Sequence, residues 1–165
     1  MDNQIELIAQ AAAQWVRDQK LTPLRIEQTL VNDGVCGTCD LVAEDEHGDL
    51  VVVDWKTTNK AAEDLPTEAW DEHREQIGFY CAAACLLLER NQARTFIVYL
   101  STKEPGAIKP CEVTDWRSAE KSFRALFNHW CYRNDYDPRL RNGTLDERSE
   151  EHTSELQSRG LISYA

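Results

Sequence analysis

The sequence lacks several features that would assign the chain to a membrane or to the cell exterior. No apolar run approaches the roughly 20 residues that a bilayer-spanning helix needs. The N-terminus carries Asp2 and Glu6, where an export signal would carry positive charge. Because the six cysteines have no secretory context, we expect reduced thiols in a cytoplasmic protein.

Positive charge is also scarce. Only 18 lysines and arginines accompany 29 acidic residues, which gives a formal net charge of −11. This balance argues against a broad phosphate-binding surface, although a local basic strip or a bound metal could still attract nucleic acid. The four histidines show no paired ligand spacing, which argues against zinc.

The length and the 42% hydrophobic content fit one domain with a core, and no repeat or linker divides it. We place this domain at residues 1–147. The segment from Arg148 to Ala165 resembles the translation of a common short-read sequencing adapter. We therefore expect it to be a non-native or disordered tail, with the native domain truncated at one or both ends.

A hairpin with polar residues in apolar strands is the most informative stretch. Two β-branched segments, residues 37–43 and 50–58, flank a turn that ends in Gly48. If this turn sets the register symmetrically about His47, Asp40 faces Asp54 and Lys56 shares their side of the sheet. Two facing carboxylates repel unless a proton or a cation lies between them. The sequence therefore predicts a divalent-metal site with a lysine beside it.

The remaining periodicity predicts helices at residues 3–19, at 67–90 and after a capping Asp115, and strands at 24–31, 95–101 and 109–113. The last helix carries one apolar stripe, which we expect to be core: Trp116, Ala119, Phe123, Phe127 and Trp130. The order α-β-β-β-α-β-(β)-α predicts an α/β (α+β) fold, with a mixed central β-sheet flanked by helices.

Four segments occur in a defined order and context: Glu27 on a strand, Gly37-Thr-Cys-Asp40, Asp54-Trp55-Lys56-Thr57, and Gln76-Ile-Gly-Phe-Tyr80 on a helix. This set resembles the RecB-like branch of the PD-(D/E)XK nuclease superfamily, particularly phage and bacterial exonuclease-type members. The resemblance covers nearly the whole domain, residues 1–147, and implies a restriction-endonuclease-like fold. Several relatives carry a histidine on a helix upstream of the first acid. None precedes Glu27 here, so either this branch lacks it or the chain begins late.

The resemblance implies a metal site made of oxygen ligands. Asp40, Asp54 and the backbone carbonyl of Trp55 would hold Mg²⁺ or Mn²⁺, which are hard ions that prefer oxygen. Glu27 would reach the metal or its waters, and its alternative is a solvated acid on an edge strand. For the acids and the lysine together, the alternative is a buried structural ion cluster.

The same resemblance assigns three further roles. Lys56 would orient the attacking water or offset developing negative charge. Gln76 and Tyr80 share a helix face and would brace the site and contact the substrate strand. Their alternative is ordinary packing of the helix on the sheet with a polar tip.

The implied function is a metal-dependent DNA exonuclease of recombination, repair or phage DNA processing, with a recombination or phage protein as a further partner. In the family, cleavage leaves a 5′-phosphate and a 3′-hydroxyl. The alternative is a catalytically inactive module of the same fold that binds DNA or a protein. Some relatives hold a four-iron, four-sulfur cluster. The spacings Cys36-x-x-Cys39 and Cys81-x-x-x-Cys85 do not supply its ligands, so we expect no cluster here.

Overall fold

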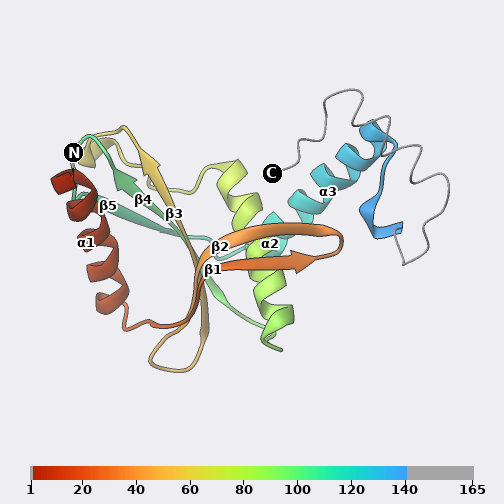
Figure 1. Ribbon diagram of the computed structural model, residues 1–165, viewed down its shortest axis with the longest axis horizontal. Helices are drawn as coiled ribbons and strands as arrows, with labels where there is room; N and C mark the ends of the chain where they lie inside the picture. The colour runs from red at the N-terminus through yellow and green to blue at the C-terminus, as the bar shows by residue number, and fades with distance from the viewer. Residues whose placement is uncertain (1, 141–165) are drawn as a thin grey trace.

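The computed structural model describes residues 2–140 and confirms the expected order of elements (Figure 1). The helices and strands are α1 (Asp2–Asp18), β1 (Thr22–Asn32), β2 (Val35–Glu44), β3 (Leu50–Thr58), α2 (Asp71–Leu87), β4 (Arg94–Ser101), β5 (Ile108–Glu112) and α3 (Trp116–Asn134). Two short 3₁₀ turns, η1 (Ala62–Asp64) and η2 (Pro138–Leu140), follow β3 and α3. The proposed domain end at residue 147 and the proposed tail at 148–165 lie outside the described residues.

The strands form one mixed sheet, as the sequence predicts. Its five strands lie in the order β1-β2-β3-β4-β5. The first three form an antiparallel meander, β4 is parallel to β3, and β5 is antiparallel to β4. Helix α2 provides the crossover that a parallel pair requires. The fold is therefore the α+β, restriction-endonuclease-like arrangement.

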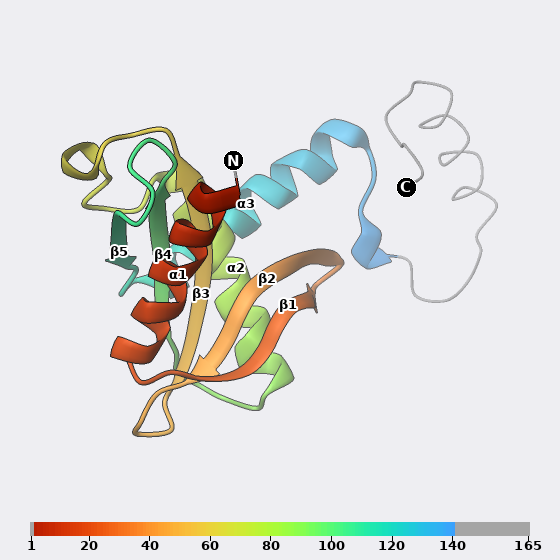
Figure 2. The same ribbon diagram turned by 60° about the vertical axis from the view of Figure 1, so that its left-hand side comes forward.

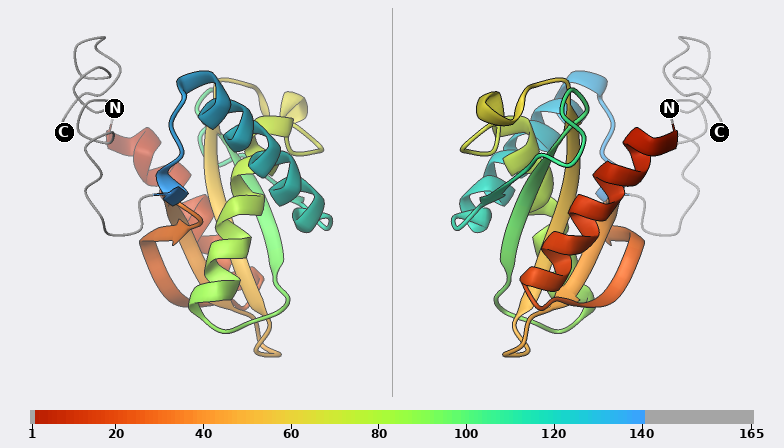
Figure 3. Two further views of the ribbon diagram at one scale, coloured as in Figure 1. Left: turned by 90° about the vertical axis from the view of Figure 1, so that its right-hand side faces the viewer. Right: turned by 90° about the vertical axis from the view of Figure 1, so that its left-hand side faces the viewer.

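Helices cover both faces of the sheet (Figure 3). Helix α1 covers one face, where the core comprises Trp15, Leu21, Leu41, Ala43, Val51, Val53, Phe96 and Val98. Helix α2 covers the other face and α3 packs beside it. A Cβ at Gly78 of α2 would lie 2.5 Å from the backbone nitrogen of Glu120, so only glycine permits this close approach. No helix within residues 2–140 has the length and apolar character needed to cross a membrane.

Three details differ from the sequence prediction. Helix α2 begins at Asp71 rather than residue 67, because Trp70 is extended and donates its backbone N–H to Tyr99 Oη. Asp115 precedes α3 without a side-chain cap, since its carboxylate accepts a 2.7 Å hydrogen bond from Arg74. The apolar stripe of α3 is core only in its first half, and Trp130 is 47% exposed.

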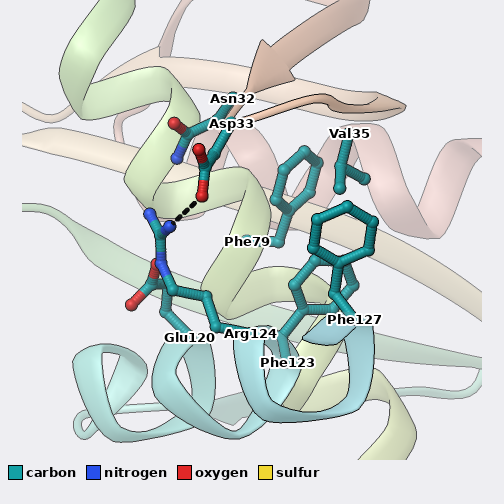
Figure 4. A pocket seen from close by; sticks show the side chains of 8 residues that line it. All are labelled: Asn32, Asp33, Val35, Phe79, Glu120, Phe123, Arg124 and Phe127. Carbon is teal, nitrogen blue, oxygen red and sulfur yellow. Dashed lines mark hydrogen bonds and ion pairs between the residues drawn. The ribbon is translucent and has the colours of Figure 1, made fainter. Parts of the chain in front are cut away.

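The hairpin formed by β1 and β2 is attached to α3 at its tip (Figure 4). Asp33 and Gly34 form its two-residue turn, with φ of 52° and 79°. Arg124 Nη1 donates a 2.6 Å hydrogen bond to Asp33 Oδ2. Beneath this ion pair is a pocket lined by Asn32, Asp33, Val35, Phe79, Glu120, Phe123, Arg124 and Phe127. None of the predicted site residues lines this pocket.

Candidate active site

The turn between β2 and β3 has the register that the sequence predicts. Ladder pairs run from Glu44 opposite Leu50 to Leu41 opposite Val53. The carboxylate of Asp45 accepts backbone hydrogen bonds from His47 and Asp49, and Gly48 has a φ of 79°. One further step in this register places Asp40 opposite Asp54.

At that position the Asp40 side chain, and not its backbone, forms the hydrogen bond to β3. Its Oδ2 accepts a 2.7 Å hydrogen bond from the backbone N–H of Trp55. The neighbouring Cys39 is fully buried, and burial raises the pKa of its thiol to about 12. Cys39 is therefore a neutral thiol at physiological pH, and Asp40 is the acidic side chain at this position of β2.

Asp54 is a buried carboxylate with one charged neighbour of each sign. It is 3% exposed, and Lys56 Nζ lies 2.7 Å from its Oδ2. Burial raises the pKa of Asp54; Lys56 opposes this rise, whereas the adjacent Asp40 adds to it. The two acids and the lysine therefore form one electrostatic unit.

A hydrogen-bonded chain connects this unit to helix α2. Lys56 Nζ donates to Gln76 Oε1 at 2.7 Å, and Gln76 Nε2 donates to Tyr80 Oη at 2.8 Å. Tyr80 is held against β2, since a Cβ on Gly37 would lie 2.8 Å from its ring. Gly37 thus makes room for the tyrosine that supports Gln76, and Gln76 in turn holds Lys56.

Trp55 and Glu27 occupy different surroundings. The Trp55 ring lies on the α1 face, with its centroid 5.6 Å from that of Trp15, so only its backbone belongs to the site. Glu27 occupies the β1 position between the pairs Ile26–Leu41 and Gln28–Cys39, which places it opposite Asp40. Its φ is 51°, an unusual conformation for a non-glycine residue, and its side chain is exposed.

The donor set fits a hard divalent cation. Asp54 Oδ2 is buried, lies 2.7 Å from the Lys56 amine and has no hydrogen-bond partner of regular geometry within residues 2–140. Two adjacent carboxylates beside one ammonium carry excess negative charge when both are ionised, and a divalent cation would neutralise it. No group of three or more His, Cys, Asp or Glu side chains gathers in the described part of the chain. The position of Glu27 as a third acid therefore stays a prediction.

Sequence reasoning missed a cluster of aromatic residues beside Lys56. Tyr99 is the β4 neighbour of Lys56 and is fully buried. Its hydroxyl lies 2.9 Å from His73 Nδ1 and accepts the backbone N–H of Trp70 at 3.0 Å. His73 precedes Gln76 by three residues, which puts the two on one helix face. This three-residue spacing suggests that His73 lies near the site, but it does not identify Tyr99 on β4 as its partner.

Comparison with known proteins gives a family and some likeness to solved structures. The family model of the PD-(D/E)XK nuclease superfamily matches residues 2–154, which includes the start of the segment set aside as a tail. A solved structure titled "Crystal structure of SSO0001" is similar with a TM-score of 0.37 and 15% identity. The likeness covers 80% of this chain and 64% of that chain, so the chain spans less than two thirds of that protein's length. No curated protein matches the chain.

Proposed function

The chain belongs to the PD-(D/E)XK nuclease superfamily, and from this premise we propose that it is a divalent-metal-dependent DNA nuclease. One observation carries the proposal: Asp54 is a buried carboxylate beside a second acid, Asp40, with the Lys56 amine 2.7 Å from its Oδ2 as the positive charge beside the two acids. Burial of this kind opposes folding, so a role in binding a cation explains it better than packing does.

Asp40, Asp54 and the backbone carbonyl of Trp55 would hold the metal, with Glu27 as a further acid. Mg²⁺ and Mn²⁺ suit oxygen ligands. When bound, the cation would supply Lewis-acid polarisation of the scissile phosphate and lower the pKa of water. Asp40 already accepts the Trp55 amide hydrogen, which holds its carboxylate beside the end of the β2–β3 ladder.

The remaining residues would position the attacking water and stabilise the transition state. Lys56 would orient the attacking water or offset the negative charge that develops on phosphorus during in-line attack. Gln76 accepts a hydrogen bond from Lys56 and donates one to Tyr80, so the pair keeps the amine directed into the site. Restricting the rotamers of a flexible lysine in advance lowers the entropy lost when the substrate binds.

The finer proposal is an exonuclease that serves recombination, repair or phage DNA processing in the cytoplasm. A recombination or phage protein would be its further partner. An exonuclease needs a free end, whereas an endonuclease also cleaves closed circles, so circular DNA separates the two.

The test is cleavage of end-labelled linear DNA and of circular DNA with Mg²⁺, Mn²⁺ or a chelator. We expect metal-dependent loss of the linear substrate alone, and loss of that activity in Lys56→Ala. Lys20→Ala is the matched control, because Lys20 forms a similar 2.6 Å ion pair with Glu46 at an exposed position. Equal activity in Lys56→Ala would overturn the mechanism. Binding to DNA without any cleavage would instead identify a non-catalytic module.

A further inference from the structure

Trp70 is a partly exposed aromatic residue whose position is firmly held. Its side chain is 38% exposed, and its ring centroid lies 5.3 Å from that of His73, with 29° between the planes. The ring of Tyr99 is also 5.3 Å away. The Trp70 backbone donates to the hydroxyl of the buried Tyr99. The Trp70 ring therefore presents apolar surface to solvent in a fixed position.

This ring is close to the candidate catalytic lysine. Tyr99 pairs with Lys56 across the parallel strands, and its hydroxyl contacts His73 at 2.9 Å. His73 stands one helical turn before Gln76, which accepts the Lys56 hydrogen bond. Lys56 is therefore the strand neighbour of Tyr99, and Tyr99 contacts Trp70.

Lys60 places a positive charge over the same ring. Its Nζ is 5.3 Å from the Trp70 ring centroid, and no ion pair within residues 2–140 includes it. By contrast, Arg74 of α2 forms an ion pair with Asp115 at 2.7 Å. The loop after β3 meets the β4–β5 loop at this end of the sheet, where Thr102 donates its N–H to Thr58 O at 2.9 Å (Figure 2). Lys60 thus lies at this end of the sheet, where its amine contacts the Trp70 ring and forms no ion pair within residues 2–140.

The charge around the ring decides which part of a nucleic acid can bind. Asp71 and Glu72 begin α2 directly after Trp70, and the chain as a whole carries −11. A surface of this kind repels a continuous run of phosphates, so affinity has to come from base stacking with one or a few phosphate contacts. Base faces are available in single strands and hidden within a duplex.

Building on the proposed nuclease function, we infer that Trp70 and Lys60 form a platform for one unpaired nucleotide of the substrate strand. On binding, the Lys60 amine exchanges its contact with the indole ring for an ion pair with the nucleotide's phosphate. The base then stacks on the ring face that Lys60 vacates. The platform would hold a single-stranded end beside Lys56. Because any base has an aromatic face, this contact selects for single-strandedness and not for sequence.

The test is fluorescence anisotropy of labelled oligonucleotides in the presence of a chelator, so that binding is measured without cleavage. Three probes are compared: a single strand, the same strand with abasic sites, and the duplex. We expect Trp70→Ala to weaken binding of the normal single strand about tenfold, in keeping with measured stacking contributions. Its binding of the abasic strand should stay unchanged, and Trp70→Phe should retain most of the affinity.

Trp130→Ala is the matched control, since Trp130 is a comparably exposed tryptophan on α3, and it should bind like the wild type. Unchanged affinity in Trp70→Ala, or equal wild-type affinity for normal and abasic strands, would overturn the platform. The second comparison holds even if Trp70→Ala fails to fold. If the wild type cleaves DNA but Trp70→Ala binds as tightly as the wild type, the platform is wrong and the nuclease proposal stands. If binding depends on Trp70 and on the bases but the protein does not cleave DNA in Mg²⁺, the nuclease proposal is wrong and the platform stands.

Discussion

The two faces of strand β3 show how one segment both builds the core and carries the candidate chemistry. Val51, Val53 and Trp55 face α1 and are packed with apolar side chains. On the other face, which α2 covers (Figure 3), Val52 is followed by Asp54 and Lys56, and Lys56 donates a hydrogen bond to Gln76 of α2. Both faces are buried, so burial alone does not explain the polar residues. Under the proposed function, the α2 face gives up stability for chemistry, while the apolar α1 face stabilises the fold.

The largest effect is expected from Asp54→Asn on the α2 face. If Asp54 holds the cation as proposed, its loss should lower cleavage by about a thousandfold or more, since a metal supplies several kcal/mol to such a reaction. Stability should be unchanged or higher, because the substitution removes a buried charge beside Asp40. Steady-state cleavage and urea unfolding of the same preparation check both parts. A large loss of stability would mean that the acid serves the fold.

The opposite result is expected from Trp15→Ala on the α1 face. Trp15 is 8% exposed and its ring lies against those of Trp55 and Phe96. Removing it should lower the free energy of unfolding by about 3 kcal/mol, with cleavage per folded molecule unchanged. Urea unfolding measures this, with Ile5→Ala, at 64% exposure on the same helix, as a nearly neutral control. Lost activity in folded Trp15→Ala would show that the faces are not independent.

Gly37→Ala tests whether the support of the lysine matters. The added methyl would meet the Tyr80 ring at 2.8 Å and displace it, and with it Gln76. We expect about a hundredfold lower cleavage, the scale typical of a reacting group misplaced by about 1 Å. Thr38→Ala, at the exposed neighbouring position, should cleave like the wild type. Wild-type rates in both variants would show that Tyr80 packs without positioning Lys56.

The smallest effect is a pH dependence that belongs to the α2 face. Burial lowers the pKa of His73, and the nearby Lys56 charge lowers it further, against an opposing effect of Glu72. The folded state therefore binds this proton less readily than the unfolded state. The neutral His73 side chain therefore contributes its full stabilisation of the folded state above the ordinary histidine pKa of about 6.5. This stabilisation is lost as the pH falls below that value.

Unfolding free energies measured between pH 7 and pH 5 should consequently decline less steeply in His73→Gln than in the wild type. His129→Gln, on the exposed part of α3, should keep the wild-type profile. A wild-type slope in His73→Gln would place the pH sensitivity elsewhere.

The parts that sequence reasoning predicted correctly are those governed by local geometry. A short turn with glycine at a positive φ sets the register of β2 and β3, so Asp40 could be placed opposite Asp54 from spacing alone. Likewise, helical periodicity placed Gln76 and Tyr80 on one face.

The parts that it missed depend on tertiary partners. Trp70 delays the start of α2 because Tyr99, 29 residues later, accepts its N–H. Asp115 does not cap α3 because Arg74 of α2 takes its carboxylate. The contact of His73 with Tyr99 exists only because β4 lies beside β3. Each involves residues far apart in sequence, which no local pattern specifies.

The central claim is most directly tested by Mn²⁺ binding, followed through the paramagnetic signal of the free ion. We predict one site in the wild type that is lost in Asp40→Asn and in Asp54→Asn and is kept in Asp49→Asn, an exposed acid at the hairpin tip. Equal Mn²⁺ binding by all four proteins would contradict the account, because the cation would then be held somewhere other than between the two facing carboxylates.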